Sequence, residues 1–517
     1  MRRRQFLGGS CGLALAALFP TACGAQLRDA RLARPVPFSL ERLRETARSL
    51  ARRPHRPAPT PAAALVEQLD YDAYQQISYR EERALFAGER GTPPIQFFHL
   101  GRHNRHPVGV HVVREGQARR FDYDRSLFAY GDEALGRRLP AALGFGGFRA
   151  LHTDRPGDWL AFSGASYFRS AGELDQYGLS ARGIAIGTGL PEAEEFPRFS
   201  ELWLEPASDG AELSVYALLE GPSLTGAYRF RCRRDGAVVM DTDAYLYPRG
   251  SIARLGIAPL TSMYWFSETN RHRATDWRPE VHDSDGLAMW TGAGERLFRP
   301  LGNPRAVRVH AYQDRDPRGF GLVQRDRAFD HYQDDGVFYE RRPSAWVEPR
   351  GSWGEGEVML VEIPTDDEIF DNVVAFWRPH APTRAGEELH YAYRLHWAAD
   401  VPAFPSSLGR AVATRTGRAG VPGQPRPAEG VKLVIDFEGG ALASVARGAA
   451  EPVITASRGR VEGAYALPVV STDRWRVVFD VYADGAEDVE LRCFLKRGDD
   501  ALTETWIYPY APARFGA

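Results

Sequence analysis

Residues 228–233 read Tyr-Arg-Phe-Arg-Cys-Arg, an alternation of apolar and charged side chains that indicates a β-strand with one buried face. Asp235-Gly236 follows, which is typical of a tight turn between antiparallel strands. Similar short segments recur at residues 202–204, 214–219, 244–247, 306–311 and 358–363. Long helical periods are scarce between residues 95 and 400, so the sequence predicts an all-β fold with a large β-sandwich or several stacked sheets.

Two helices are expected before these strands. Ser39 can cap a helix in which Leu40, Leu43, Ala47 and Leu50 recur at helical spacing. A second candidate begins near Pro61 and runs to about residue 74.

Residues 402–430 mark the plainest domain boundary, because they are rich in Pro, Gly, Ser, Ala and Arg and lack periodicity. Strand patterns return from residue 431 onward and suit a small immunoglobulin-like sandwich. We therefore divide the chain into a signal segment (1–25), a large β-sandwich domain (26–401), a linker (402–430) and an immunoglobulin-like domain (431–517).

The N-terminus has the features of a secretory signal of the twin-arginine type. Adjacent arginines and Phe6-Leu7 precede a short apolar run, Gly8 to Phe19, which is well under the ~20 residues that span a bilayer. We expect a cleaved, soluble, periplasmic chain. Lipidation at Cys23 stays an alternative, although Pro20 stands where a lipoprotein signal has an aliphatic residue.

The net charge limits the classes of partner that the chain is expected to bind. The net charge is −2, and loss of the three signal arginines brings the mature chain to about −5. This gives no electrostatic basis for binding nucleic acid or anionic lipid, so a neutral partner is expected.

Cys232 and Cys493 each occur alone on an apolar strand pattern and are interpreted as buried free thiols.

Several familiar motifs are absent from the sequence. It contains no His-Glu-x-x-His helix, Walker loop or Gly-x-Ser-x-Gly elbow. Residues 144–147 lack dinucleotide-binding spacing, and residues 283–286 resemble a calcium loop whose glycine comes too early and whose distal Glu is missing. No metal and no cofactor are expected.

Three acidic clusters stand among aromatic residues, at 277–286, 329–336 and 364–372. Aromatic faces stack on sugar rings and carboxylates bind sugar hydroxyls, so this combination suits carbohydrate. Cleavage of a glycosidic bond needs one protonated carboxyl and a second group that activates water. Acid-rich turns between strands are also typical of solvated strand ends, and spacing alone does not decide between the two.

The same clusters, with other motifs, carry a family resemblance. The further motifs are residues 177–183 (YGLSARG), 195–199 (EFPRF), 258–263 (APLTSM), 319–322 (GFGL), 342–349 (RPSAWVEP) and 371–375 (DNVVA). Together they resemble the osmoregulated periplasmic glucan biosynthesis proteins G and D. The resemblance extends from residues 71–75 to residues 504–506, and the twin-arginine leader favours the D type.

This resemblance implies a galactose-mutarotase-like β-sandwich followed by an immunoglobulin-like domain. It also implies a β-1,2-glucan substrate and anomer-inverting endo-cleavage of that backbone. Some similar proteins transfer the glycosyl group instead, giving cyclic or branched products. A non-catalytic scaffold that hands glucan to membrane-bound synthesis proteins is a third alternative, and a homodimer is one possible assembly.

The resemblance also implies roles for single residues. The general acid falls on Asp371, and the carboxylate linked to water activation falls on Asp283. In inverting enzymes the two carboxyls stand roughly 6.5–9.5 Å apart; in this family the base acts through a relay of waters and hydroxyls. Tyr339 and Glu368 are expected to line the cleft, with Asp366 as a helper. Trp277, Trp290 and Trp346 are candidate sugar platforms or, equally, core residues.

Two departures from the family pattern bear on the reaction type. Phe370 precedes Asp371 where relatives have a polar residue, and residues 336–338 (Gly-Val-Phe) alter the loop before Tyr339. Both lie where an acceptor sugar or water would be selected, so the choice between hydrolysis and transfer stays open.

Overall fold

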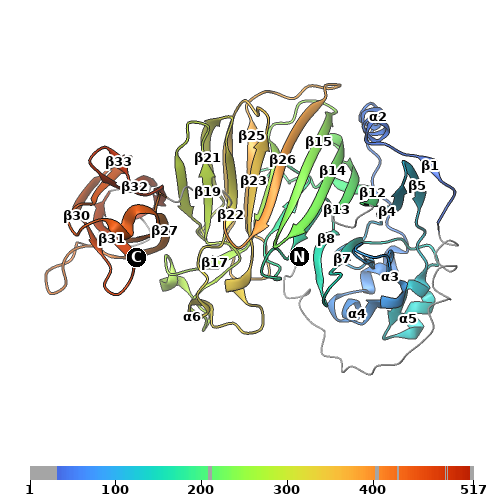
Figure 1. Cartoon of the computed structure of the whole chain (residues 1–517), viewed down its shortest axis with the longest axis horizontal. Coiled ribbons are helices and arrows are strands. Elements are labelled where there is room, and N and C mark those ends of the chain that lie inside the picture. Colours follow the sequence, from blue (N-terminus) through green and yellow to red (C-terminus); the bar gives the residue numbers. More distant parts are fainter. Residues whose placement is uncertain are drawn as a thin grey trace.

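The computed structural model describes residues 32–512, except residues 208–211, 402–406, 428–429, 484 and 486. The predicted signal segment, including Cys23, lies outside the described residues. Nearly all regular structure is β, which confirms the predicted all-β class (Figure 1). Two large sheets form the body of the molecule, and a smaller sheet lies at the C-terminal end.

The larger sheet has sixteen strands and runs the length of the molecule. In sheet order its strands are β1 (Val36–Pro37), β5 (Gln117–Arg120), β4 (Gly109–Arg114), β12 (Arg198–Pro206), β13 (Glu212–Glu220), β14 (Leu224–Asp235), β15 (Ala237–Pro248), β26 (Leu389–Ala398), β23 (Ser344–Arg350), β22 (Gly319–Val323), β19 (Gly286–Trp290), β20 (Arg296–Pro300), β34 (Thr505–Tyr510), β32 (Val489–Arg497) and β29 (Glu451–Ala456), with β33 (Asp500–Ala501) beside β32.

The second sheet has ten strands and packs face to face on the first. Its strands in order are β21 (Arg308–Arg315), β24 (Glu355–Glu362), β25 (Val373–Pro379), β16 (Leu255–Ser262), β10 (Ser180–Arg182), β9 (Tyr167–Ser170), β8 (Asp158–Ser163), β7 (Gly147–Leu151) and β3 (Ile95–Phe98), with β11 (Ile184–Ile186) beside β16. Two short pairs, β2 (Ile77–Tyr79) with β6 (Phe128–Tyr130) and β17 (Tyr264–Phe266) with β18 (Val281–His282), complete this part.

The core between the two sheets follows from the alternation in β14. Phe230 and Cys232 are buried, whereas Arg231 and Arg233 on the other face are half-buried. The ring of Phe230 lies 5.4 Å from Phe162 of β8 and 4.9 Å from Phe168 of β9. Aromatic side chains of the two sheets therefore interdigitate, as in a sandwich core. Cys232 and Cys493 are buried and free, as predicted.

The helices are short and lie mostly at the N-terminal end (Figure 1). They are α2 (Leu40–Ala51), α3 (Ala63–Gln68), α4 (Tyr71–Gln75), α5 (Glu133–Arg138) and α6 (Phe329–Tyr332), with 3₁₀ turns η2 (Glu81–Arg83), η3 (Arg125–Leu127), η4 (Arg271–Arg273), η5 (Tyr339–Arg341) and η6 (Gly440–Ser444). The Ser39 cap of α2 is confirmed, since its side chain accepts from the Arg42 amide. The expected second helix is divided into α3 and α4, because Asp70 caps α4 anew.

The C-terminal end is a sandwich of two sheets. One is the four-stranded sheet β27 (Arg410–Arg418), β28 (Gly430–Glu438), β31 (Arg474–Tyr482) and β30 (Arg460–Pro468). It packs on β34, β32 and β29, with Leu433 and Leu491 in one shared core. The expected linker therefore needs correction: residues 410–418 form β27, whose small Ala and Thr side chains do not give the usual strand alternation.

The C-terminal end is continuous with the large sheet. β34 pairs in parallel with β20, so that Leu297 lies opposite Thr505 and Phe298 opposite Trp506. Beside this seam, Arg325 forms a buried ion pair with Glu504, whose side chain also accepts from the Ala411 amide at 2.9 Å. Main-chain pairing and a buried ion pair thus hold the C-terminal end on the large sheet.

A second buried ion pair, between Arg299 of β20 and Glu362 of β24, joins the two large sheets. The guanidinium donates to both carboxylate oxygens, at 2.7 and 2.6 Å, and the Gly302 amide donates to the same carboxylate. The two side chains are 2% and 1% exposed. Each buried charge is therefore compensated by the opposite charge of its partner.

His99 makes part of the stability dependent on pH. It is buried; its Nδ1 donates to the Leu100 carbonyl at 2.7 Å, and the hydroxyls of Tyr123 and Tyr130 lie 3.3 Å from its Nε2. Burial lowers the pKa of His99 from 6.5 to about 4, against the opposing effect of the Leu100 hydrogen bond. In the unfolded chain His99 is therefore protonated below about pH 6.5, whereas in the folded chain it is protonated only below about pH 4.

We expect the His99 contribution to stability to be present above pH 6.5 and to be lost as the pH falls towards 4, by about 1.4 kcal/mol per pH unit at most. Urea unfolding of wild type and His99→Gln at pH 7 and pH 5 measures the change in the free energy of unfolding. The decrease from pH 7 to pH 5 should be smaller in the variant, and an equal decrease in both proteins would contradict this assignment.

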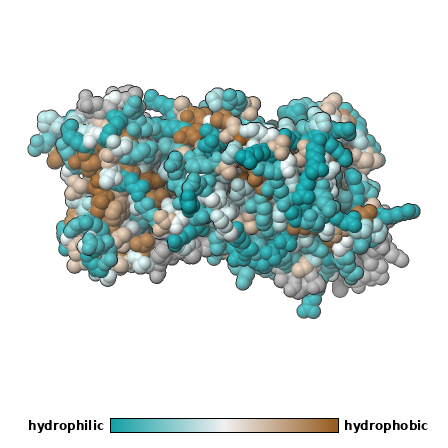
Figure 2. Space-filling view, turned by 90° about the horizontal axis from the view of Figure 1, so that it is seen from above, coloured by the Kyte–Doolittle hydropathy of each residue, from teal (hydrophilic) through white to brown (hydrophobic). Residues whose placement is uncertain are grey.

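The surface seen in Figure 2 is largely hydrophilic, with small apolar patches concentrated towards the C-terminal end. Among the residues described, no helix has both the length and the hydropathy needed to cross a bilayer.

Candidate active site

Asp371 lies two residues before β25, and the residue after it fixes its position. Asn372 is buried; its side chain accepts from the Tyr264 amide at 2.8 Å and donates to the carbonyls of Tyr264 and Ile363 at 2.9 Å. This amide thus ties the loop carrying Asp371 to both neighbouring segments. Asp371 is half-buried and its Oδ1 is shielded from solvent.

Asp371 lines a pocket of about 400 Å³ whose wall is rich in aromatic side chains. Phe370, beside it in sequence, is 48% exposed, and Tyr71 on the far wall is 37% exposed. The wall also contains Tyr74, Phe98, His103, Asn104, Tyr167, Phe168, Arg169 and Ser180. A carboxyl group among exposed ring faces and polar donors is the combination that sugar binding requires.

Tyr167 of β9 is close enough to Asp371 to respond to its charge. Burial raises the pKa of Tyr167 to about 12; the Arg182 guanidinium opposes this rise, and the charge of Asp371 adds to it. Arg182 lies over the Tyr167 ring at 4.9 Å and is paired with Glu194 at 2.6 Å. The phenol therefore keeps its proton at neutral pH and can donate to a bound sugar hydroxyl.

Asp283 is not in the wall of this pocket. It follows β18, its amide donates to the Met263 carbonyl at 2.9 Å, and its side chain is fully buried. Its carboxylate forms an ion pair with Arg342. Arg342 in turn lies over the Tyr339 ring, 3.9 Å from its centroid. Asp283 is therefore shielded from water and joined to Tyr339 through an arginine.

Glu368 completes this network. The Tyr339 hydroxyl donates to its carboxylate, and Arg278 donates to the same carboxylate at 2.8 Å. Arg278 also pairs with Asp276 and Asp334, at 2.8 and 2.7 Å. Burial alone would lower the pKa of Arg278, but its hydrogen bonds to Asp276 and Glu368 raise this pKa above its ordinary value. All three acidic clusters noted in the sequence therefore meet at Arg278.

The fold brings together three of the predicted residues, Asp283, Tyr339 and Glu368. Glu368 is three positions before Asp371, so the network and the pocket share one loop. Sequence reasoning missed the two arginines, Arg278 and Arg342, which compensate the buried acids. The signal was present, since Arg278 lies inside the first acidic cluster and Arg342 follows the second, but Arg342 is far in sequence from Asp283 and Arg278 is far from Glu368.

Tyr339 and Glu368, which were expected to line the cleft, are buried and do not line the pocket. The remaining predicted residues also lie outside the pocket wall. Trp346 is 3% exposed and packs in the C-terminal core, so it has no free face for a sugar and the core alternative applies to it. Trp290 is half-buried, with the Arg296 guanidinium 3.4 Å from its ring centroid. Trp277 is 71% exposed and Asp366 is exposed. Only Trp277 therefore presents an open ring face.

Comparison with known proteins gives the family. The family model described as periplasmic glucan biosynthesis protein, MdoG, matches residues 38–510. The chain belongs to this family. A glucans biosynthesis protein D 2 from Ralstonia nicotianae is 49% identical over 526 residues, covering 99% of this chain and 98% of the relative. A glucans biosynthesis protein D from Stenotrophomonas maltophilia is 49% identical over 531 residues, covering 100% and 99%.

Family membership confirms the resemblance drawn from the motifs. A glucans biosynthesis protein D 1 from Ralstonia nicotianae is 51% identical over 493 residues, covering 92% of each chain. The match to the MdoG family includes the loop of Asp371 and the network around Arg278. Within the described part of the chain, one group of side chains has metal-ligand spacing, Glu280, Asp326 and His331, and none of the three lines the pocket.

Proposed function

We propose that this chain is a periplasmic glycoside hydrolase that cleaves β-1,2-glucan internally with inversion of the anomeric centre, after export by the twin-arginine route. As a member of the MdoG family, it has a role in periplasmic glucan biosynthesis. The observation that carries the catalytic proposal is the position of Asp371, a clamped and half-buried carboxyl in the wall of an aromatic pocket.

In this proposal Asp371 protonates the glycosidic oxygen of the bound glucan. The C–O bond to the anomeric carbon then breaks, and a water attacks from the opposite face. Tyr167 and the exposed rings of Phe370 and Tyr71 hold the sugar units on either side. This use of the pocket explains why a fully buried amide, that of Asn372, fixes the loop beside Asp371.

Asp283 has a less direct role in the proposal. Because its side chain is fully buried and paired with Arg342, it does not touch a water in the pocket in this conformation. The path from Asp283 through Arg342 and Tyr339 to Glu368 leads to the loop of Asp371. We propose that the proton of the attacking water leaves through intervening hydroxyls and waters towards Asp283.

One observation favours glycosyl transfer as a second candidate reaction. Phe370 adjoins the proposed acid and is 48% exposed in the pocket wall. An aromatic face at this point can stack on an acceptor sugar and displace water, and an acceptor hydroxyl would then attack in place of water.

The experiment is incubation of the purified chain with linear β-1,2-glucan and, as a matched control, linear β-1,3-glucan. Reducing ends, product size and the anomeric proton signals of fresh products are followed by NMR. Hydrolysis predicts short chains with new α-anomeric reducing ends from the β-1,2-glucan alone. Products of new size without new reducing ends would establish transfer, and an unchanged polymer would contradict catalysis and leave a binding or scaffold role.

A further inference from the structure

We propose that Glu280, Asp326 and His331 form a binding site for a divalent first-row transition metal such as Mn²⁺, separate from the pocket of Asp371. One ligand atom from each of the three side chains lies within 4.8 Å of the other two. Two carboxylate oxygens and one imidazole nitrogen are ligands that Mn²⁺ and Zn²⁺ accept.

The three ligands are brought together from two distant segments. Glu280 precedes β18, whereas Asp326 and His331 stand on either side of the start of α6. Asp326 shapes its own turn, because its Oδ1 accepts from the Ala328 amide at 3.0 Å while its Oδ2 contacts Nδ1 of His331. The carboxylate of Asp326 thus already fixes the position of the His331 imidazole beside it.

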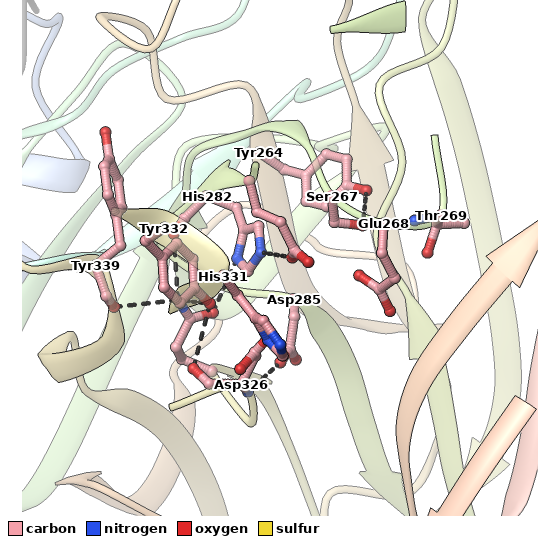
Figure 3. A network of polar contacts seen from close by, with 12 residues as sticks. Tyr264, Ser267, Glu268, Thr269, His282, Asp285, Asp326, His331, Tyr332 and Tyr339 are labelled. Carbon is pink, nitrogen blue, oxygen red and sulfur yellow. Dashed lines mark hydrogen bonds and ion pairs between the residues drawn. The ribbon is translucent and has the colours of Figure 1, made fainter. Parts of the chain in front are cut away.

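A fourth side chain, Asp285, gives an independent indication that a cation binds here. Its Oδ2 accepts from the amides of Arg325 and Asp326, at 2.6 and 2.9 Å, whereas its Oδ1 is shielded from solvent and has no hydrogen-bond partner among the described residues. Figure 3 shows Asp285 next to Asp326, whose amide it accepts from. A buried carboxylate oxygen without a donor is costly unless a cation or a proton compensates it.

The exposure of the three ligands provides an entry path for a cation. Side-chain exposure increases from 7% at Glu280 through 17% at Asp326 to 45% at His331. A cation can therefore enter from the His331 side and reach a deep carboxylate, which is what a site with an access route requires.

Occupation of this site would order the segment that carries Tyr339. Gln324 donates to the Tyr332 hydroxyl and to the Tyr339 carbonyl, at 3.0 and 3.2 Å. The rings of Tyr332 and Tyr339, both labelled in Figure 3, stack with their centroids 5.9 Å apart. His282 links this glutamine to Glu280, with 3.0 Å contacts on both ring nitrogens. A metal held by Glu280 and His331 would thus close the loop between residues 326 and 339.

The test is a Mn²⁺ titration of the purified full chain after chelator treatment, with free Mn²⁺ read by electron paramagnetic resonance. We expect one Mn²⁺ per chain, and at least tenfold weaker binding in His331→Ala and in Glu280→Gln. Asp330→Asn is the matched control: it removes an acid next to His331 that hydrogen-bonds Gln333 and is not one of the three ligands. Binding by Asp330→Asn should equal that of wild type.

A second measurement, the melting temperature, distinguishes loss of the metal site from misfolding of a variant. Saturating Mn²⁺ should raise the melting temperature of wild type and Asp330→Asn by about 2–4 °C and leave His331→Ala unchanged. His331 is half-exposed, so its replacement leaves the core intact. The site is overturned if wild type does not bind Mn²⁺, if both ligand variants bind as wild type does, or if Asp330→Asn weakens binding equally. None of these readouts depends on glucan cleavage.

Discussion

Asp371→Asn is expected to lower the rate of β-1,2-glucan cleavage by about 10²–10⁴-fold, the usual loss when a general acid is removed. Asparagine keeps the shape of the side chain but has no acidic proton to give to the glycosidic oxygen. Because the side chain of Asn372 holds the loop and asparagine keeps the size of aspartate, the variant should bind glucan and melt as wild type does. Initial rates of reducing-end release, with glucan affinity measured in parallel, separate catalysis from binding.

Asp366→Asn is the matched control for this experiment. It makes the same chemical change five positions away, at an exposed residue outside the pocket wall. We expect its rate to stay within about threefold of wild type. Equal activity of Asp371→Asn and wild type would refute the assignment of the acid, and an equal loss in both variants would show that the loop is sensitive to any substitution.

Glu362→Gln is expected to lower the free energy of unfolding by about 3–5 kcal/mol, because it leaves the Arg299 guanidinium buried and without a counter-charge. The glutamine oxygen can still accept one hydrogen bond, so the loss reports charge more than geometry. Urea unfolding followed by tryptophan fluorescence measures it.

The double variant Arg299→Met/Glu362→Met provides the comparison. It removes both charges and keeps comparable volume, so it should be clearly more stable than the single variant. A single variant as stable as wild type, or a double variant less stable than the single one, would show that this pair does not hold the two sheets as described.

Local patterns in the sequence were sufficient for the fold class. The alternation at residues 228–233 becomes β14, with Phe230 in the core and Arg231 on the outer face. The same method failed at β27, because its Ala and Thr side chains are too small and too similar to alternate in hydropathy. Composition then suggested a linker where main-chain pairing with β28 forms a strand.

The site was predictable only in part, for a related reason. Asp371 and Glu368 belong to one motif, so both could be assigned from the resemblance. The partner of Asp283 is Arg342, 59 positions further on, and that of Glu368 is Arg278, 90 positions before it. Only the order of strands in the folded sheets brings these side chains together, and no spacing in the sequence encodes it.

The insertion of β34 between β20 and β32 has a consequence for the protection of a sheet edge. Strands β32 and β29 connect to the rest of the largest sheet only through residues 505–510, among the strands described. Removal of these residues would expose the hydrogen-bonding edge of β20, and such open edges recruit other chains. β34 therefore protects the body of the molecule against edge-to-edge aggregation as well as joining it to the C-terminal end.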